Sequence, residues 1–298
     1  ISRDAKYIDL LERTLYNSVL SGVSLSGTEY FYVNPLRVVD PMPTELRYPR
    51  TRQPFFTSFC CPPNLLRTIV EVSGLTYCKT EDAIWINLYG SNSLKTALDG
   101  EESELVQQTD YPWDGDILFE IVECPQAEFA LRLRVPEWSD RVVVRVNSET
   151  VDDLAPESGY AEVRRKWSAG DKLEVHFPMP ARVMQANPNI EETTGQVAIQ
   201  RGPIVYCLES VDLPDGIDLD QVVVPKDIEL SHQYIPETLQ GVVVVEGTAL
   251  ASQKIDWGSK LYREINPEEL GEFRLRSIPY FAWANRGATE MSVWLPAR

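Results

Sequence analysis

The sequence lacks the features that mark several common protein classes. It has only two histidines in 298 residues, and it contains no Ser-His-Asp set, no phosphate-binding P-loop and no Gly-x-Gly-x-x-Gly motif. No apolar run reaches the roughly 18 residues that a membrane span needs, and no signal peptide can be recognised. Serine-type hydrolysis, nucleotide binding by a P-loop and dinucleotide binding therefore lack their usual signatures here.

Basic residues are also few. Lys and Arg number 28 against 45 Asp and Glu, which gives a net charge of −17 at pH 7. Such a surface repels phosphate backbones and anionic lipids, so we expect neither nucleic acid nor a membrane as a partner. A neutral ligand such as a sugar is compatible with this surface, although acidity that serves only solubility explains it equally well.

The cysteine pattern excludes a secreted disulfide framework. There are five cysteines, an odd number, and Cys60 and Cys61 are adjacent. The other three, Cys78, Cys124 and Cys207, lie in apolar stretches that are typical of strands. We expect these three to be inert residues of a hydrophobic core.

Two helices are predicted near the N-terminus. Residues 4–20 carry one apolar stripe at helical spacing, formed by Ile8, Leu11, Leu15 and Val19. Residues 62–73 form the second candidate, with prolines in the first turn and Gly74 as a stop signal. These helices make residues 1–76 a mostly helical segment.

After Gly74 the apolar pattern changes to a period of two. Examples are the alternating positions Phe129, Leu131, Leu133 and Val135, and later Leu173, Val175 and Phe177. Short strands with frequent turn signals indicate a β-sandwich or a β-barrel. We therefore predict a mainly β fold, in which two β-sandwich domains, residues 77–182 and 183–298, follow the helical segment.

Cys60 and Cys61 come directly before the second predicted helix. A helix N-terminus offers free N–H groups and the positive end of the helix dipole, and both stabilise a thiolate. A thiolate is the reactive form of cysteine, both as a nucleophile and as a zinc ligand. Two cysteines alone are a weak zinc signal, because a closed site needs about four ligands. The alternative is that both are small hydrophobic residues buried at a helix start.

Glu12 and Tyr32 are further candidates for a site. Glu12 falls within the apolar stripe of the first helix, where a carboxylate is costly unless it is paired or functional. The alternative is that it reaches the edge of the stripe or caps a neighbouring segment. Tyr32 is weaker, because a tyrosine close to a proline in a loop usually packs. His176 alternates outward from a predicted strand, so we expect it to be solvated.

Several segments of the chain resemble one family. They run in order from about residue 4 to residue 298 and read LLERTLYNSVLSGVSLSGTEYFYVNPL, FCCPPNLLRTIVEVSG followed by AIWINLYG, LRLRVPEW, GQVAIQRGPIVYCLE and IPYFAWANRGATEMSVWLP. They are similar to the bacterial β-L-arabinofuranosidases, a family of glycoside hydrolases once known as a domain of unknown function. Several of these matches are long and unlike the motifs of common folds, so we regard the resemblance as specific.

The resemblance implies an architecture and site residues. In that family an (α/α)₆ barrel carries the active site and two β-sandwiches follow it, so residues 1–76 would be the C-terminal remnant of the barrel. The resemblance makes Cys60 the catalytic nucleophile and a zinc contact, and Cys61 a second zinc ligand. Glu12 and Tyr32 match family residues that line the sugar site.

The implied reaction is the retaining hydrolysis of non-reducing terminal β-L-arabinofuranosides. The Cys60 thiolate would attack the anomeric carbon, and water would resolve the glycosyl thioether. The partner would be an arabinofuranose-containing oligosaccharide or glycan, and a homodimer is compatible with the resemblance.

The resemblance also implies that some of the family's catalytic and zinc-binding residues are not in this sequence. The family's acid/base glutamate and its Glu-x-Cys zinc ligands lie upstream of the region that Ile1 matches. We therefore expect the chain to hold two of four zinc ligands and to be inactive alone. The alternative function is a non-catalytic carbohydrate-binding or scaffold module of β-sandwiches. A thiol redox protein is disfavoured, because the adjacent cysteines form no Cys-x-x-Cys loop.

Overall fold

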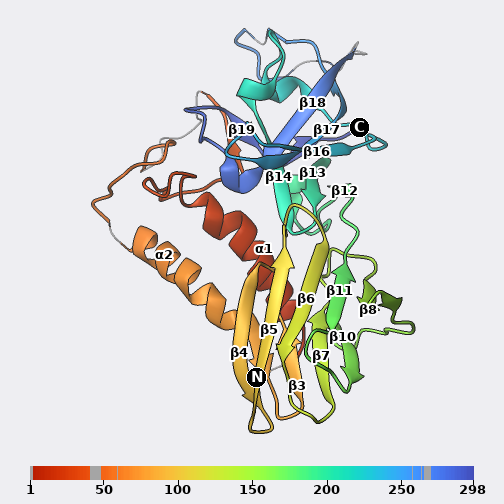
Figure 1. Cartoon of the computed structure of the whole chain (residues 1–298). Helices are drawn as coiled ribbons and strands as arrows, with labels where there is room; N and C mark the ends of the chain where they lie inside the picture. Colours follow the sequence, from red (N-terminus) through yellow and green to blue (C-terminus); the bar gives the residue numbers. More distant parts are fainter. Residues whose placement is uncertain (1–2, 41–47, 59, 257, 263, 265–269) are drawn as a thin grey trace. The chain divides into compact units, whose positions relative to one another are not determined.

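The computed structural model describes the whole chain except residues 1–2, 41–47, 59, 257, 263 and 265–269. The chain forms two compact units, shown with their labelled elements in Figure 1. Unit 1 contains residues 1–16 and 64–180, and unit 2 contains residues 17–63 and 181–298. Among the described residues, no helix combines the length and apolarity that a membrane crossing requires.

Both predicted helices form. Helix α1 (Lys6–Arg13) continues into a π-helical segment, η1 (Thr14–Val19), and α2 (Cys61–Glu71) continues into a 3₁₀ turn, η2 (Val72–Leu75). Two prolines occupy the first turn of α2, where a missing N–H costs no helical hydrogen bond. The apolar stripe of the first helix is only half-buried, whereas the polar residues Glu12 and Asn17 are its buried positions.

Unit 1 contains a β-sandwich. One sheet has the order β10-β7-β3-β2, with β10 (Tyr160–Arg165), β7 (Phe129–Arg134), β3 (Ala83–Ile86) and β2 (Tyr77–Lys79). The other has the order β4-β5-β6-β11-β8-β9, with β4 (Asn92–Leu98), β5 (Glu101–Thr109), β6 (Asp116–Glu123), β11 (Lys172–His176), β8 (Val143–Val146) and β9 (Glu149–Thr150). Strands β3 and β7 pair in parallel, and the other pairs within these two sheets are antiparallel.

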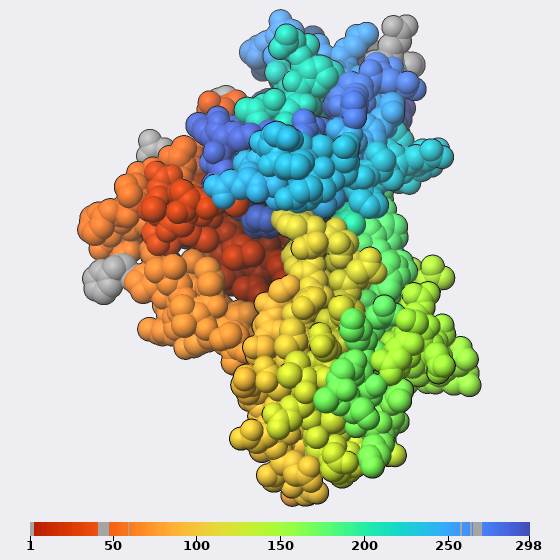
Figure 2. Space-filling view, viewed as in Figure 1, coloured from red at the N-terminus to blue at the C-terminus, as the bar shows by residue number. Residues whose placement is uncertain are grey.

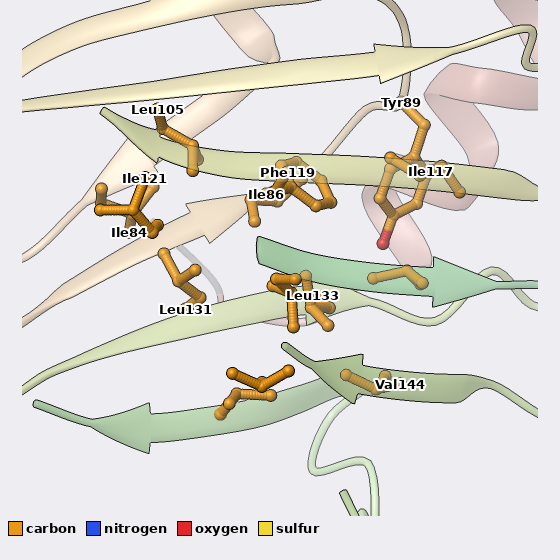
Figure 3. Packing of buried hydrophobic residues seen from close by; sticks show 14 of the residues in the cluster. Ile84, Ile86, Tyr89, Leu105, Ile117, Phe119, Ile121, Leu131, Leu133 and Val144 are labelled. Atoms are coloured by element: carbon orange, nitrogen blue, oxygen red, sulfur yellow. The ribbon is translucent and has the colours of Figure 1, made fainter. Parts of the chain in front are cut away.

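The two sheets of unit 1 enclose a hydrophobic core. Alternate residues of β6 (Ile117, Phe119 and Ile121) point toward Leu131 and Leu133 of β7, as Figure 3 shows. None of these five side chains is more than 2% exposed. The period of two in the sequence therefore reflects strands with one face on this core.

In the described part of the chain, unit 2 adds ten further strands in one network of hydrogen-bonded pairs. The main path runs β1-β19-β14-β18-β17-β15, with β1 (Arg37–Val38), β19 (Met291–Ser292), β14 (Ile204–Glu209), β18 (Gly271–Pro279), β17 (Val242–Ala251) and β15 (Val222–Val223). Strand β13 (Gln196–Arg201) pairs with β12 (Ala181–Met184), β14 and β20 (Leu295–Pro296), and β16 (Ser231–Ile235) pairs with β17. The predicted mainly β fold after a helical segment is confirmed. The division into domains 1–76, 77–182 and 183–298 stays a prediction.

The three cysteines expected in the core differ from one another. Cys207 in β14 is buried, and burial raises the pKa of its thiol well above the ordinary value. Cys124 is only partly buried, and Cys78 is exposed. The expectation is therefore wrong for Cys78, because its strand β2 is the edge strand of its sheet.

Replacing Leu133 by alanine should destabilise unit 1 strongly. The side chain is fully buried between the two sheets, and removing it leaves a cavity that costs about 2–5 kcal/mol. Urea unfolding followed by tryptophan fluorescence measures the shift in midpoint. The matched control is Val122→Ala on β6, where the side chain is 42% exposed and a change within about 0.5 kcal/mol is expected. Equal shifts for both variants would contradict the assignment of this core.

Candidate active site

Unit 2 brings Tyr32 together with the two adjacent cysteines. The Tyr32 Oη lies 3.7 Å from the Cys60 Sγ, and the Cys60 Sγ lies 3.6 Å from the Cys61 Sγ. Both distances are within the range of hydrogen bonds to sulfur, and the two sulfurs are too far apart for a disulfide bond. Three of the four predicted site residues therefore share one small cluster.

The position of Cys60 favours a thiolate. Cys60 is exposed and comes directly before α2, whose first residue is Cys61. Hydrogen bonds from the Tyr32 hydroxyl, the Cys61 thiol and two backbone N–H groups lower the pKa of Cys60. Burial raises the pKa of Cys61, and the hydrogen bond to Cys60 raises the pKa of Tyr32. Cys60 is thus the member of the cluster that loses its proton first, and Tyr32 remains a neutral donor.

Residues on both sides of Tyr32 hold it in place. The preceding Phe31 is buried and stacks on Trp283, with ring centroids 4.7 Å apart. The Trp283 indole N–H donates a hydrogen bond of 2.8 Å to the Asn34 side-chain oxygen. Because Phe31 and Asn34 are both bound to the same tryptophan, the backbone between them presents Tyr32 in a defined direction.

Two aromatic residues that the sequence analysis did not single out also contact Tyr32. The Tyr48 ring lies 3.7 Å from the Tyr32 ring, centroid to centroid, and the Phe56 ring lies 5.8 Å from it. Tyr48 also donates a hydrogen bond of 3.1 Å to the Ser58 hydroxyl. These residues come from a proline-rich loop without periodicity, so no sequence signal beyond their aromatic character could have found them.

The geometry of the cysteine pair fits half of a zinc site. Two thiolates that bind one tetrahedral zinc ion at about 2.3 Å lie about 3.8 Å apart, close to the 3.6 Å between the Cys60 and Cys61 sulfurs. In the part of the chain that the structure describes, no group of three or more His, Cys, Asp or Glu side chains could hold a metal. The sulfur spacing therefore suits two ligands of such a site, and zinc binding by Cys60 and Cys61 stays a prediction.

Glu12, the fourth predicted site residue, lies in unit 1 and is fully buried. Its carboxylate accepts a hydrogen bond of 2.6 Å from the Tyr111 hydroxyl and one of 3.2 Å from the Trp138 indole N–H. It also forms an ion pair with the Arg134 guanidinium. The ion pair with Arg134 thus offsets the cost of burying the Glu12 carboxylate on the apolar stripe. The sequence analysis had named such pairing as one way to meet this cost. A contact with sugar stays a prediction.

Arg134 connects this carboxylate to the β-sandwich. It is the last residue of β7, its side chain is fully buried, and it also pairs with Asp9 of α1 at 2.6 Å. Its Nε donates a hydrogen bond of 2.6 Å to the backbone oxygen of Asn87. Two carboxylates of α1 therefore hold one buried guanidinium, and helix α1 is bound to the sandwich of unit 1.

Comparison with known families assigns the chain. Three models of glycoside hydrolase family 127 match it: the catalytic domain of β-L-arabinofuranosidases at residues 1–74, the middle domain at 83–179 and the C-terminal domain at 181–296. The chain belongs to this family of glycoside hydrolases.

Individual relatives agree with this assignment. A non-reducing end β-L-arabinofuranosidase of Bifidobacterium longum subsp. longum is 30% identical over 97% of this chain and 45% of its own length. A solved glycoside hydrolase is 42% identical, with a TM-score of 0.94 over 99% of this chain and 49% of its own. A family 127 β-L-arabinofuranosidase from Geobacillus stearothermophilus T6 is 40% identical, with a TM-score of 0.92 over 100% and 47%. The chain thus spans about half the length of these relatives.

Replacing Glu12 by alanine should destabilise unit 1. The change leaves a fully buried Arg134 with one carboxylate fewer, and breaking a buried pair in this way costs about 3–5 kcal/mol. Urea unfolding measures the loss. As a control, Lys95→Ala removes an exposed pair with Glu104, which is worth about 0–1 kcal/mol. A Glu12 variant as stable as the Lys95 variant would show that the ion pair is not structural.

Cys60 should react with iodoacetamide before Cys61 in the metal-free protein at pH 7.5. Its sulfur is exposed and its pKa is lowered, so a larger fraction is thiolate. Replacing Tyr32 by phenylalanine removes the main hydrogen bond that lowers this pKa, and alkylation at a given pH should slow. Peptide mass spectrometry over a pH series measures both rates. Unchanged alkylation of Cys60 in the Tyr32→Phe variant would contradict the role of the hydroxyl.

Proposed function

We propose that this chain is part of a retaining β-L-arabinofuranosidase that removes non-reducing terminal β-L-arabinofuranose with Cys60 as nucleophile. The supporting observation is the exposed Cys60 sulfur at the start of α2, within hydrogen-bonding distance of the Tyr32 hydroxyl and the Cys61 thiol. The substrate class follows from the family and from the curated relative, which acts on this type of glycosidic bond.

In the proposed first step the Cys60 thiolate attacks the anomeric carbon of the arabinofuranose. A carbon–sulfur bond forms while the bond to the glycosidic oxygen breaks, and a general acid protonates the departing oxygen. Water then attacks the same carbon and gives a proton to the group that acted as acid in the first step, and the electron pair of the carbon–sulfur bond returns to sulfur. Two displacements at one centre give net retention of configuration.

The cysteine pair would hold zinc as half of its ligand set. When bound, zinc supplies a positive charge that keeps a coordinated thiol deprotonated near neutral pH. Cys61 would serve mainly as a ligand, and Cys60 as both ligand and nucleophile. The general acid and the other two ligands would come from residues outside this sequence, so we propose that the chain is inactive alone.

The remaining cluster residues would orient the nucleophile. The Tyr32 hydroxyl donates a hydrogen bond to Cys60 and stays protonated, so it can direct the sulfur without competing as a base. Tyr48 and Phe56 pack against the Tyr32 ring and restrict its rotation. Tyr32 and Glu12 as direct sugar contacts remain part of this proposal.

In the full-length enzyme, Cys60→Ser should abolish turnover, whereas Cys61→Ser should lose zinc first and activity as a consequence. A serine alkoxide is inaccessible near pH 7, and a hydroxyl is a poor zinc ligand compared with thiolate. The loss for Cys60→Ser should be on the order of 10³-fold or more, as for other covalent nucleophiles. Turnover and zinc content are measured together. The matched control is Cys78→Ser on the edge strand β2, which should change neither.

The decisive measurement is mass spectrometry after reaction with a furanose inhibitor that carries an electrophile at its anomeric carbon. Label on Cys60 supports the proposal. Label on a glutamate, or full activity in Cys60→Ser, would show that the cysteine pair is structural and that another residue attacks the sugar.

A further inference from the structure

A second candidate site lies in unit 1, on the outer face of the six-stranded sheet. A cavity of about 620 Å³ opens there, within the range of roughly 300–1,000 Å³ that is usual for small-molecule sites. It is lined by residues of β5, β6, β8 and β11 and of the loop before β6. Figure 2 shows this side of the sheet, where the yellow surface of β5 and β6 meets the green surface of β11.

The strand registers place polar side chains around an apolar floor. One row across four strands reads Gln108, Leu118, Glu174 and Arg145, since these residues are successive register partners. On β6, β11 and β8 the neighbours of these residues along the strand point into the hydrophobic core, and on β5 the neighbouring Gln107 is buried. The row therefore lies on the outer face and is carried by strands, which hold side chains more firmly than loops do.

The next row adds a hydrogen-bonded pair and a second apolar residue. Asp116, His176 and Val143 are register partners, and the His176 ring nitrogen lies 2.6 Å from the Asp116 carboxylate. Leu118 and Val143 are the two aliphatic side chains that face outward in these rows. His176 points outward, as the sequence predicted.

Three polar side chains of the first row are available to a ligand. In the regions of the chain that the structure describes, Gln108, Glu174 and Arg145 make no side-chain hydrogen bond and no ion pair. An amide, a carboxylate and a guanidinium can each bind two adjacent hydroxyl groups, and the aliphatic floor matches the C–H face of a sugar ring. This combination of groups suits a polyhydroxylated ligand.

The charge of the residues that line the cavity favours a neutral ligand over an anionic one. Asp110, Asp114, Asp116 and Glu174 outnumber Arg145 and His176, so the cavity is acidic. An anionic sugar would meet a repulsive field, whereas a neutral one would not. We propose that this cavity is an accessory binding site for neutral carbohydrate, formed by the first β-sandwich and used in addition to the cysteine-bearing site. This proposal rests on the proposed function, since it assumes a carbohydrate substrate. It is tested by measuring sugar binding and needs no measurement of turnover.

One such site should bind weakly. Its floor carries no aromatic ring to stack on a sugar, and most of its contacts are hydrogen bonds exchanged with water. We expect a Kd of roughly 1 mM for a neutral arabino-oligosaccharide, as for a ligand with few buried contacts. Titration calorimetry and saturation-transfer NMR with the 298-residue chain can both detect this affinity.

The test compares substitutions in the cavity with one beside it. Glu174→Ala and Gln108→Ala should each weaken binding by about 10-fold, as expected for a lost hydrogen bond to a charged or amide group. The matched control is Glu120→Ala, on the same outer face of β6 but outside the cavity lining, and it should leave binding unchanged. Circular dichroism confirms that all three variants fold.

Three binding results would overturn the proposal, and so would a fourth, given below for Cys60→Ser. These are no binding up to about 50 mM ligand, far above the expected Kd; equal or tighter binding of an oligogalacturonate; and undiminished binding by both cavity variants. Cys60→Ser separates this site from the catalytic proposal. It should leave the binding intact, and a loss of binding in that variant would place the sugar at the cysteine pair instead. Failure of the accessory site leaves the turnover prediction for Cys60 untouched.

Discussion

The cysteine-bearing site depends on one buried arrangement in unit 2, in which Arg52 lies over the ring of Phe31 and Phe31 stacks on Trp283. The Arg52 guanidinium lies 4.4 Å from the Phe31 ring centroid and donates hydrogen bonds to the backbone oxygens of Ser21, Phe281 and Trp283. It thereby joins the segment before Tyr32 to the turn that follows β18. Burial lowers the pKa of Arg52 to about 10, so the side chain remains charged at neutral pH. Within unit 2, residues near the end of the chain thus position Tyr32, which lies in the segment that the catalytic-domain model matches.

Helix α1 and the segment around Tyr32 are held in place by different interactions, buried ion pairs in the first case and aromatic packing in the second. Buried charge pairs add little net stability compared with apolar packing, but losing one partner is costly, so they specify a single arrangement. Arg134 can be satisfied only when Asp9 and Glu12 of α1 are in place. By contrast, Phe31 and Trp283 bury large apolar rings and contribute through area and stacking. Helix α1 is therefore located mainly by charge, and the segment around Tyr32 mainly by aromatic packing.

Local periodicity predicted strands such as β6 and β11 well, because alternate residues of each are buried in the core between the two sheets. The start of α2 was also predictable, since Pro62 and Pro63 suit the first turn of a helix. The partners of Glu12 were not, because Arg134 and Tyr111 are 122 and 99 residues away in the sequence. The roles of Tyr48 and Phe56 could not be predicted, because both residues lie in a loop without hydrophobic periodicity. Their positions follow from contacts with Tyr32. The outer cavity needs strand registers, which a sequence pattern alone does not supply.

The parallel pairing of β3 with β7 has a consequence for the order of folding. Between these strands the chain forms β4, β5 and β6, which pair as neighbours through short connections. Local hairpins close quickly, whereas a pair that joins distant segments must first overcome the entropy of closing a long loop. The sheet that contains β3 and β7 is therefore expected to form after the β4-β5-β6 meander. The last residue of β7 is Arg134. Helix α1 can dock only then, so an N-terminal element of the chain becomes one of the last to reach its native place.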